Sequence, residues 1–334
     1  MPPLATVGIL SIGEMGMGIA KLLIAHDYHV VTNIEGRSED THARALQSKI
    51  ETLPTDEDLI QRSDYILSIV PPRDALATAQ RITRAWKPLN RAATAREQPL
   101  YYIDLNAISP RSAREIGSLF ATSASEIRFL DGGIIGGPPC PAGSDVKENT
   151  ASSHPTTGHA WKRPSIHVSG AWPLSDAPVS GAHLGELLNM KHLSAEIGPA
   201  SGLKCCFAST SKGFTAICIQ AFTTAAQLGV LGELQDEMRA RAPGLFGFAA
   251  AGVTSMPPKA YRWVREMHEI GDTHADEGGF ANGIFNEVAE VYRQVADETV
   301  LGLEKTERRK RGRDIQDVAT AMAEGLQTKR KKVE

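Results

Sequence analysis

The residues with the clearest chemical meaning are the glycines that follow the first apolar run of the chain. Residues 6–10 read as a short buried strand, Gly13, Gly16 and Gly18 come next, and residues 19–23 begin an apolar helical pattern. A strand, a glycine-rich turn and a helix in this order are typical of a dinucleotide site, where glycine lets the backbone approach a pyrophosphate. The free N–H groups at the start of the helix would bind that anion.

One position departs from the usual G-x-G-x-x-G fingerprint, because Ser11 stands where the first glycine belongs. A glycine-rich turn without a ligand is therefore the alternative. The residues that we expect to contact a cofactor in this turn are Ser11, Ile12, Gly13, Glu14 and Met15.

The next strand pattern, residues 29–34, is followed by Glu35, Gly36, Arg37 and Ser38. A site that prefers NAD keeps an acidic side chain here for the ribose 2′-hydroxyl, and Glu35 allows that interpretation. A guanidinium and a hydroxyl suit a 2′-phosphate instead. Gly36, Arg37 and Ser38 therefore favour NADP(H), and a plain surface turn is the remaining alternative.

Two further strand patterns cover residues 65–70 and 100–105. In an open α/β sheet the ligand lies at the carboxyl ends of the strands. We therefore expect Val70, Pro71 and Asn106 to lie beside the cofactor. For Asn106, capping of the following helix is the alternative role.

A fifth strand pattern, residues 128–131, leads into a glycine- and proline-rich loop at residues 132–141. Residues 142–164 are polar and show no period, which predicts a flexible insert. Residues 165–169 resume as a strand, and residues 184–190 read as a short helix.

From Leu203 onward the sequence shows only helical patterns. The expected helices span residues 203–238, 244–253, 259–270, 284–304 and 315–326. The predicted fold is an α/β Rossmann-type N-terminal domain followed by an all-α C-terminal domain. The expected bounds are residues 1–198 for the cofactor domain, 199–326 for the helical substrate and dimerisation domain, and 327–334 for a basic tail.

The composition narrows the class of protein. A net charge of −3 over 334 residues argues against a nucleic-acid surface across the chain, and the basic clusters at 305–313 and 329–332 are expected to be solvated. Four cysteines without a C-x-x-C pair indicate neither a zinc site nor a disulfide framework, which fits the reducing cytoplasm. The N-terminus has no signal-peptide pattern, and residues 213–232 carry too many polar side chains for a membrane span. His268 and His274 are six residues apart, so no helical metal site is expected.

Six motifs resemble the β-hydroxyacid dehydrogenase superfamily, whose relatives include 6-phosphogluconate dehydrogenase and the imine reductases. The motifs are, in chain order, GILSIGEMGMGIAKLL, EGRS, DLNAISP, DGGIIGGPP, IGPASGLKCCFASTSKG and PKAYRWVREMHEI. The last of them is similar to the branch with a C-terminal helical domain of the DUF1932 type. The resemblance covers nearly the whole chain.

The resemblance implies that Lys204 is the catalytic lysine. Such a lysine moves a proton to or from the substrate oxygen while hydride joins or leaves the neighbouring carbon. A lysine at a helix start that reaches solvent is the alternative, and Lys212, eight residues on, is the rival candidate. The residues expected to bind substrate are Ile134, Ile135, Gly136, Gly137 and Lys212.

Two positions depart from the pattern of this superfamily. Ala208 stands where an asparagine usually follows the lysine by four residues, and Ile135 stands where carboxylate-binding members carry a serine. Both changes remove polar groups that would orient a small hydroxyacid. They favour a larger and more apolar carbonyl, alcohol or imine.

The expected function is therefore that of an NADPH-dependent oxidoreductase acting on a small-molecule carbonyl or hydroxyl. An imine reductase or reductive aminase is one alternative, although Asp or Tyr typically holds the position of Lys204 there. A non-catalytic NADP-binding protein is the other. Relatives are typically homodimers with interlocked helical domains, so we expect a homodimer, without nucleic-acid or membrane partners.

Overall fold

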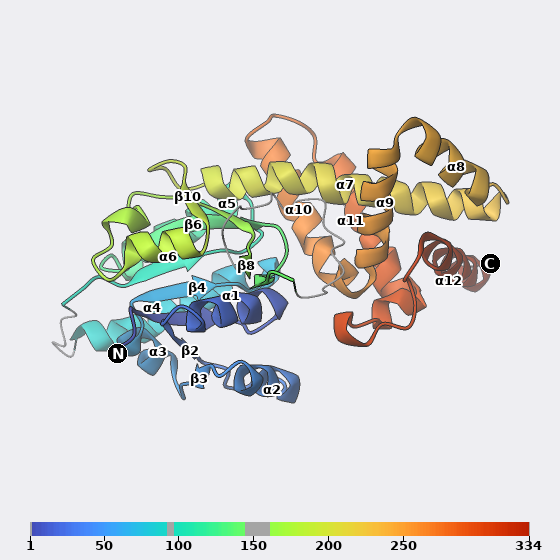
Figure 1. Ribbon diagram of the computed structural model, residues 1–334. Helices are drawn as coiled ribbons and strands as arrows, with labels where there is room; N and C mark the ends of the chain where they lie inside the picture. Colours follow the sequence, from blue (N-terminus) through green and yellow to red (C-terminus); the bar gives the residue numbers. More distant parts are fainter. Residues whose placement is uncertain (1, 92–96, 144–160, 334) are drawn as a thin grey trace. The chain divides into compact units, whose positions relative to one another are not determined.

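The computed structural model describes residues 2–91, 97–143 and 161–333 (Figure 1). The described residues up to Lys204 form one compact unit, and those from Cys205 onward form a second. The first unit is a sheet covered by helices and the second is helical, which confirms the predicted fold class. Most of the insert expected at 142–164 lies outside the described residues.

The first unit is built on an eight-stranded sheet in the order β10-β9-β6-β5-β4-β1-β2-β3. The order from β3 to β6 is that of a doubly wound dinucleotide-binding sheet. Neighbouring strands are parallel except for the antiparallel pair β6 and β9. The strands are β1 (Thr6–Leu10), β2 (His29–Thr32), β3 (Glu51–Thr52), β4 (Tyr65–Ser68), β5 (Tyr101–Asp104), β6 (Arg128–Ile135), β9 (Ser165–Ser169) and β10 (Met190–His192). Strands β7 (Cys140–Pro141) and β8 (Trp161–Lys162) pair separately.

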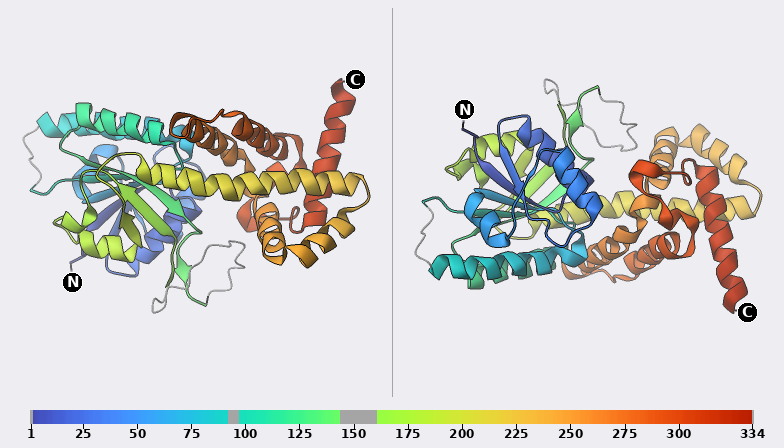
Figure 2. Two further views of the ribbon diagram at one scale, coloured as in Figure 1. Left: turned by 90° about the horizontal axis from the view of Figure 1, so that it is seen from above. Right: turned by 90° about the horizontal axis from the view of Figure 1, so that it is seen from below.

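Both faces of this sheet are buried under helices, as Figure 2 also shows. Along β4, Tyr65 and Leu67 belong to one core and Ile66 to the other, because successive side chains point to opposite faces. This explains why the strands read as continuous apolar runs. The helices are α1 (Glu14–Ile24), α2 (Glu39–Gln47), α3 (Asp56–Arg62), α4 (Ala75–Arg91), α5 (Pro110–Ser123) and α6 (Gly181–Leu187), with short 3₁₀ turns at η1 (Pro72–Asp74) and η2 (Leu174–Asp176).

The second unit is a helical bundle whose core includes the edge-to-face pair Trp263 and Tyr292, with ring centroids 5.1 Å apart. Its helices are α7 (Pro199–Gln227), which begins in the first unit, α8 (Leu231–Arg241), α9 (Pro243–Ser255), α10 (Ala260–Asp276), α11 (Gly283–Glu298) and α12 (Ile315–Val333). Short 3₁₀ turns lie at η3 (Pro257–Lys259), η4 (Val300–Leu303) and η5 (Thr306–Arg308).

Two predicted helices were too long. The helix expected over 203–238 is interrupted, because Gly229 adopts a left-handed conformation (φ +74°) between α7 and α8. A glycine in this conformation is a common helix terminator. The helix expected over 284–304 ends at Glu298, and Thr299 then starts η4 by accepting the N–H of Leu301 at 3.1 Å.

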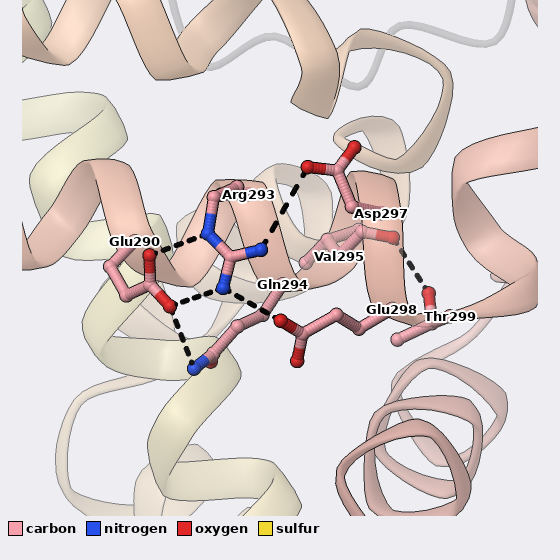
Figure 3. Close-up of polar contacts among 7 residues, drawn as sticks. All are labelled: Glu290, Arg293, Gln294, Val295, Asp297, Glu298 and Thr299. Atoms are coloured by element: carbon pink, nitrogen blue, oxygen red, sulfur yellow. Dashed lines mark hydrogen bonds and ion pairs between the residues drawn. The ribbon is translucent and has the colours of Figure 1, made fainter. Parts of the chain in front are cut away.

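The end of α11 carries an ion-pair cluster around Arg293 (Figure 3). Its guanidinium donates to Glu290 and to Glu298 at 2.6 Å each, and it lies 3.9 Å from Asp297. The neighbouring carboxylates raise the pKa of Arg293. Each of these acidic side chains thus has a cation beside it, and partly exposed pairs of this kind contribute little stability.

The first test concerns the irregular fingerprint. Ser11 has φ +80°, the left-handed region that favours glycine. Relieving that strain is worth about 1–2 kcal/mol, partly offset by about 0.5–1 kcal/mol for the greater freedom of an unfolded glycine. We expect Ser11→Gly to raise the free energy of unfolding by up to about 1 kcal/mol in urea denaturation. Ser11→Ala keeps the strain and is the control; equal stability of the two variants would contradict the prediction.

Candidate functional site

The glycine turn between β1 and α1 leaves an open helix N-terminus. Gly13 is the residue that precedes α1, it is exposed, and a Cβ atom added to it would meet nothing within 4 Å. The first N–H groups of a helix have no partners within the helix, and in α1 these include the N–H groups of Glu14 and Met15. The geometry therefore provides room and donors for an anion at Gly13.

Gly16 and Gly18, which lie within α1, allow close packing. A Cβ atom on Gly16 would lie 2.3 Å from the carbonyl oxygen of Ser11, so α1 folds tightly back on the turn. On Gly18 it would lie 2.9 Å from Pro138 and 3.0 Å from Pro139. Gly18 therefore brings α1 against the loop after β6, a contact that the sequence analysis missed because the two segments are 120 residues apart.

The turn after β2 presents the groups predicted to select the cofactor. Gly36 adopts φ +71°, and the N–H of Arg37 closes the turn on the carbonyl of Ile34 at 3.0 Å. The side chains of Glu35, Arg37 and Ser38 are exposed. Both Glu35, which would bind the ribose 2′-hydroxyl of NAD, and Arg37, which would bind the 2′-phosphate of NADP, are therefore accessible to a cofactor.

A partly buried network of hydrogen bonds that the sequence analysis missed supports this turn. Asn33 accepts the N–H of Glu35 at 3.0 Å and donates to Asp56 at 2.8 Å. Arg81 pairs with the same carboxylate at 2.6 Å. Arg44 of α2 donates to the carbonyl of Ile12 at 2.8 Å, which ties α2 to the glycine turn.

Asn106 joins the ends of two neighbouring strands. Its side-chain oxygen accepts the N–H of Val70 at 2.7 Å, and its amide donates to Ser68 at 3.1 Å. Asn106 is 2% exposed. The structure therefore uses this amide to fix Val70 and Pro71 at the carboxyl end of β4, rather than leaving it exposed to a ligand.

Asp104 at the end of β5 is a buried carboxyl group with an incomplete set of partners. One oxygen accepts the N–H of Asn106 at 2.9 Å, and the other has no hydrogen-bond partner among the described residues. Burial raises the pKa of Asp104 to about 7, and the charge of Asp131 adds to the effect. Asp104 and Asp131 occupy paired positions on β5 and β6.

Lys204 lies in the second turn of α7, against β6. A Cβ atom added to Gly133 would lie 2.7 Å from the Cβ atom of Lys204, so the lysine stem crosses β6 where no side chain intervenes. Lys204 is partly buried, and no carboxylate pairs with it in the part of the chain that the structure describes. Its neighbours Cys205 and Ala208 are buried, whereas Phe207 is 38% exposed.

The loop predicted over residues 132–141 begins later in the structure, because β6 continues to Ile135 and pairs there with β9. The four residues predicted to bind substrate here have different environments. Ile134 is 7% exposed and belongs to the core of the first unit. Ile135 is partly exposed, and Gly136 has φ +125° with Pro164 close to its missing side chain. Nothing lies within 4 Å of a Cβ atom added to Gly137. Of these four residues, Ile135 at the end of β6 and the two glycines after it are therefore the more accessible ones.

Lys212 lies in the second unit with its charge already balanced. Its ammonium pairs with Glu266 and stands 4.7 Å from the centre of the Trp263 ring. The side chains of Lys212 and Glu266 are 16% and 8% exposed. The charge of Lys212 is already compensated by a mostly buried carboxylate, which makes Lys212 a weaker candidate than Lys204.

Within residues 2–91, 97–143 and 161–333, no group of three or more His, Cys, Asp or Glu side chains could hold a metal ion. No helix over the same described residues is long and apolar enough to cross a membrane.

Two known families match parts of the chain. Residues 6–89 match the family described as NADP oxidoreductase, coenzyme F420-dependent. Residues 225–295 match the domain of unknown function DUF1932. The first match contains the glycine turn and the turn after β2, and the second lies within the helical unit.

Comparisons with individual proteins agree with these matches. An uncharacterised 28.5 kDa protein in the 7S RNA 5′ region of Methanothermus fervidus is 23% identical over 230 residues, 69% of this chain and 74% of that protein. The structure of 3-hydroxyisobutyrate dehydrogenase from Salmonella typhimurium has a TM-score of 0.63 at 16% identity, covering 95% of this chain and 99% of that chain. An imine reductase from Myxococcus stipitatus in complex with NADP⁺ has a TM-score of 0.51 at 17% identity, covering 94% and 98%. The structural likeness shows the fold, and with the family matches it confirms the resemblance to this superfamily with a DUF1932 region.

A second test follows from the pKa of Asp104. Between about pH 4 and pH 7 the unfolded chain has lost the proton of this carboxyl while the folded protein keeps it, so the contribution of Asp104 to stability falls as the pH rises through this window. We expect Asp104→Asn to remove this cost. Its free energy of unfolding relative to wild type should rise between pH 4.5 and pH 8 by a few kcal/mol, since each pKa unit corresponds to about 1.4 kcal/mol.

Urea denaturation of both proteins at the two pH values checks this. Asp40→Asn, at an exposed position on α2, is the control and should give the same difference at both pH values. A pH-independent difference for Asp104→Asn would contradict the prediction.

Proposed function

We propose that this protein is an NADP(H)-dependent oxidoreductase that transfers hydride to or from a small carbonyl or hydroxyl compound. The observation that carries the proposal is the open helix N-terminus at Gly13, at the carboxyl edge of a sheet with dinucleotide-binding strand order. The match of residues 6–89 to a family of NADP oxidoreductases supports it independently.

The cofactor fits the described residues at three places. The space above Gly13 and the N–H groups of Glu14 and Met15 suit the pyrophosphate. Arg37 and Ser38 suit the 2′-phosphate. Val70 and Pro71, held in place by Asn106, would border the nicotinamide end. When bound, NADP(H) supplies or accepts the hydride.

The proposed task of Lys204 is to supply or accept the proton that accompanies the hydride. An oxygen that gains a hydride on its carbon must also gain a proton, and an ammonium within hydrogen-bond reach can give it. Lys204 suits this task better than Lys212, because the ammonium of Lys212 already pairs with Glu266. The carbon stem of Lys204 is held against Gly133.

The proposed substrate is a compound with an apolar part next to the reacting carbon. Ile135 is partly exposed at the position where carboxylate-binding members of the superfamily carry a serine. Ala208 stands where an asparagine usually follows the lysine by four residues. Neither residue can hydrogen-bond a small hydroxyacid through its side chain. An imine is the second candidate substrate, and the likeness to the fold of an imine reductase supports it.

The homodimer and the cytoplasmic location stay predictions. Within the second unit, α7 and α8 border an open groove of about 500 Å³ whose lining includes Ile217, Leu228 and Val230. Ile217 is 60% exposed and Leu228 is 71% exposed. Exposed apolar side chains of this kind are typical of a surface that another chain covers, which supports association of two copies.

A third test separates NADPH from NADH at the turn after β2. We expect Arg37→Met to weaken NADPH binding by about tenfold to a hundredfold, because a charge-assisted hydrogen bond to phosphate contributes about 1.5–3 kcal/mol. NADH binding should stay within about twofold, since NADH lacks the 2′-phosphate. Titration of cofactor fluorescence at fixed salt measures both affinities.

Glu35→Gln is the matched control, because it removes the opposite charge two residues away. It should leave NADPH binding unchanged. If Glu35→Gln weakened NADH binding while Arg37→Met left NADPH binding intact, the protein would prefer NAD, and the assignment of the phosphate to Arg37 would be wrong.

A fourth test concerns the chemical step. Deuteride transfer from labelled NADPH is measured against a panel of aldehydes, ketones and cyclic imines. We expect Lys204→Met to lower the rate on the accepted substrate by about 10²–10⁴, because loss of a general acid has this effect. NADPH affinity should be unchanged.

Lys191→Met, at an exposed position on β10, is the control for loss of a positive charge and should retain the full rate. A Lys204→Met protein with the wild-type rate would refute the role of Lys204. Tight NADPH binding without transfer to any compound of the panel would favour a non-catalytic nucleotide-binding protein instead.

A further inference from the structure

The start of α7 is attached to the sheet by one fully buried carboxylate. Asp131 of β6 has no exposed surface. One of its oxygens accepts the N–H of Gly198 at 3.0 Å, the N–H of Ser201 at 3.1 Å and the hydroxyl of Ser169 at 3.0 Å. The other accepts the hydroxyl of Ser201. The hydroxyl of Ser169 in turn accepts the N–H of Ala200 at 3.1 Å.

These hydrogen bonds supply acceptors for the backbone N–H groups at the start of α7. The first N–H groups of a helix lack partners within the helix, and a negative charge is favoured at that end. Asp131, directly and through Ser169, binds the N–H groups of Gly198, Ala200 and Ser201. The carboxylate therefore fixes both the position and the direction of the first turn of α7.

A second contact one turn further along fixes the rotation of the helix. Residues two apart on a strand share a face, so Asp131 and Gly133 both face α7. Ser201 and Lys204 are three apart and share a face of the helix. Asp131 accepts the N–H of Ser201. The carbon stem of Lys204 packs against Gly133, where an added Cβ atom would lie 2.7 Å from the Cβ atom of Lys204.

We propose that Asp131 is a positioning residue for Lys204: by holding the first turn of α7 against β6, it sets where the lysine ammonium lies. The inference depends on the proposed function only for the catalytic role of Lys204, since the geometry concerns the lysine itself. Small displacements of a reacting group cost large factors in rate. A carboxylate that only stabilised the fold would leave the environment of the Lys204 ammonium unchanged.

The test uses Asp131→Asn in the full chain. An asparagine keeps the shape of the side chain but replaces one acceptor oxygen with a donor. We expect kcat for deuteride transfer to fall at least tenfold, with NADPH affinity within about twofold of wild type. In a separate sample, reductive methylation with ¹³C-formaldehyde labels the lysines, and the Lys204 signal is assigned by its loss in Lys204→Arg. This signal should shift in Asp131→Asn.

Asp64→Asn is the matched control. Asp64 also accepts a backbone N–H of the first unit, that of Thr6 at 2.8 Å. It directly precedes β4, whereas Asp131 is level with the opposite, carboxyl end of that strand. Asp64→Asn should lower the stability without any change in kcat or in the Lys204 signal. Ser201→Ala, which removes only the hydroxyl contact with Asp131, is the milder variant should Asp131→Asn fail to fold, and it should shift the same signal.

An unchanged Lys204 signal in Asp131→Asn or Ser201→Ala would overturn the inference, even if activity fell. A shifted signal with reduced kcat supports it. Should Lys204→Met itself keep the wild-type rate, the proposed function fails, but a shifted signal would still support the positioning of the lysine by Asp131.

Discussion

The structure of the first unit depends on a sheet that is buried on both faces. Such a sheet can offer polar groups to a ligand only at its edges, and in a parallel sheet the carboxyl ends of neighbouring strands meet at the same edge. Gly13 follows β1, Arg37 follows β2 and Val70 follows β4, although the three are far apart in sequence. The apolar burial that stabilises the fold is thus also what collects the candidate binding groups in one place.

Two aspartates at paired positions show how much the local partners matter. Asp104 and Asp131 are both fully buried on neighbouring strands. Asp131 accepts hydrogen bonds at both oxygens, whereas one oxygen of Asp104 has no hydrogen-bond partner among the described residues. A carboxylate stripped of water is stable as an anion only when donors replace that water. The N–H groups at the start of α7 and the hydroxyls of Ser169 and Ser201 replace that water around Asp131, whereas burial raises the pKa of Asp104 to about 7.

Sequence patterns predicted the elements with long apolar periods and missed what depends on contacts between distant segments. The strands over residues 6–10 and 165–169 have their expected bounds. The two-residue strand β3 and the short edge strand β10 are too short to show a period. Ser11 departs from the glycine fingerprint in sequence, but its backbone adopts the left-handed conformation that favours glycine. No local signal in the sequence could link Gly133 to Lys204, because that contact exists only once α7 packs on β6.

Contacts between distant segments also distinguish the two candidate lysines of α7, Lys204 and Lys212. The ammonium of Lys212 pairs with Glu266 and faces the Trp263 ring, and both interactions stabilise its charged form. Breaking that pair would leave a mostly buried carboxylate without its cation, which is costly. Among the described residues, no carboxylate pairs with Lys204. Its carbon stem packs against the backbone of β6 at Gly133. This difference in partners, more than the position of either residue along the helix, favours Lys204 over Lys212 as the candidate for the proposed proton transfer.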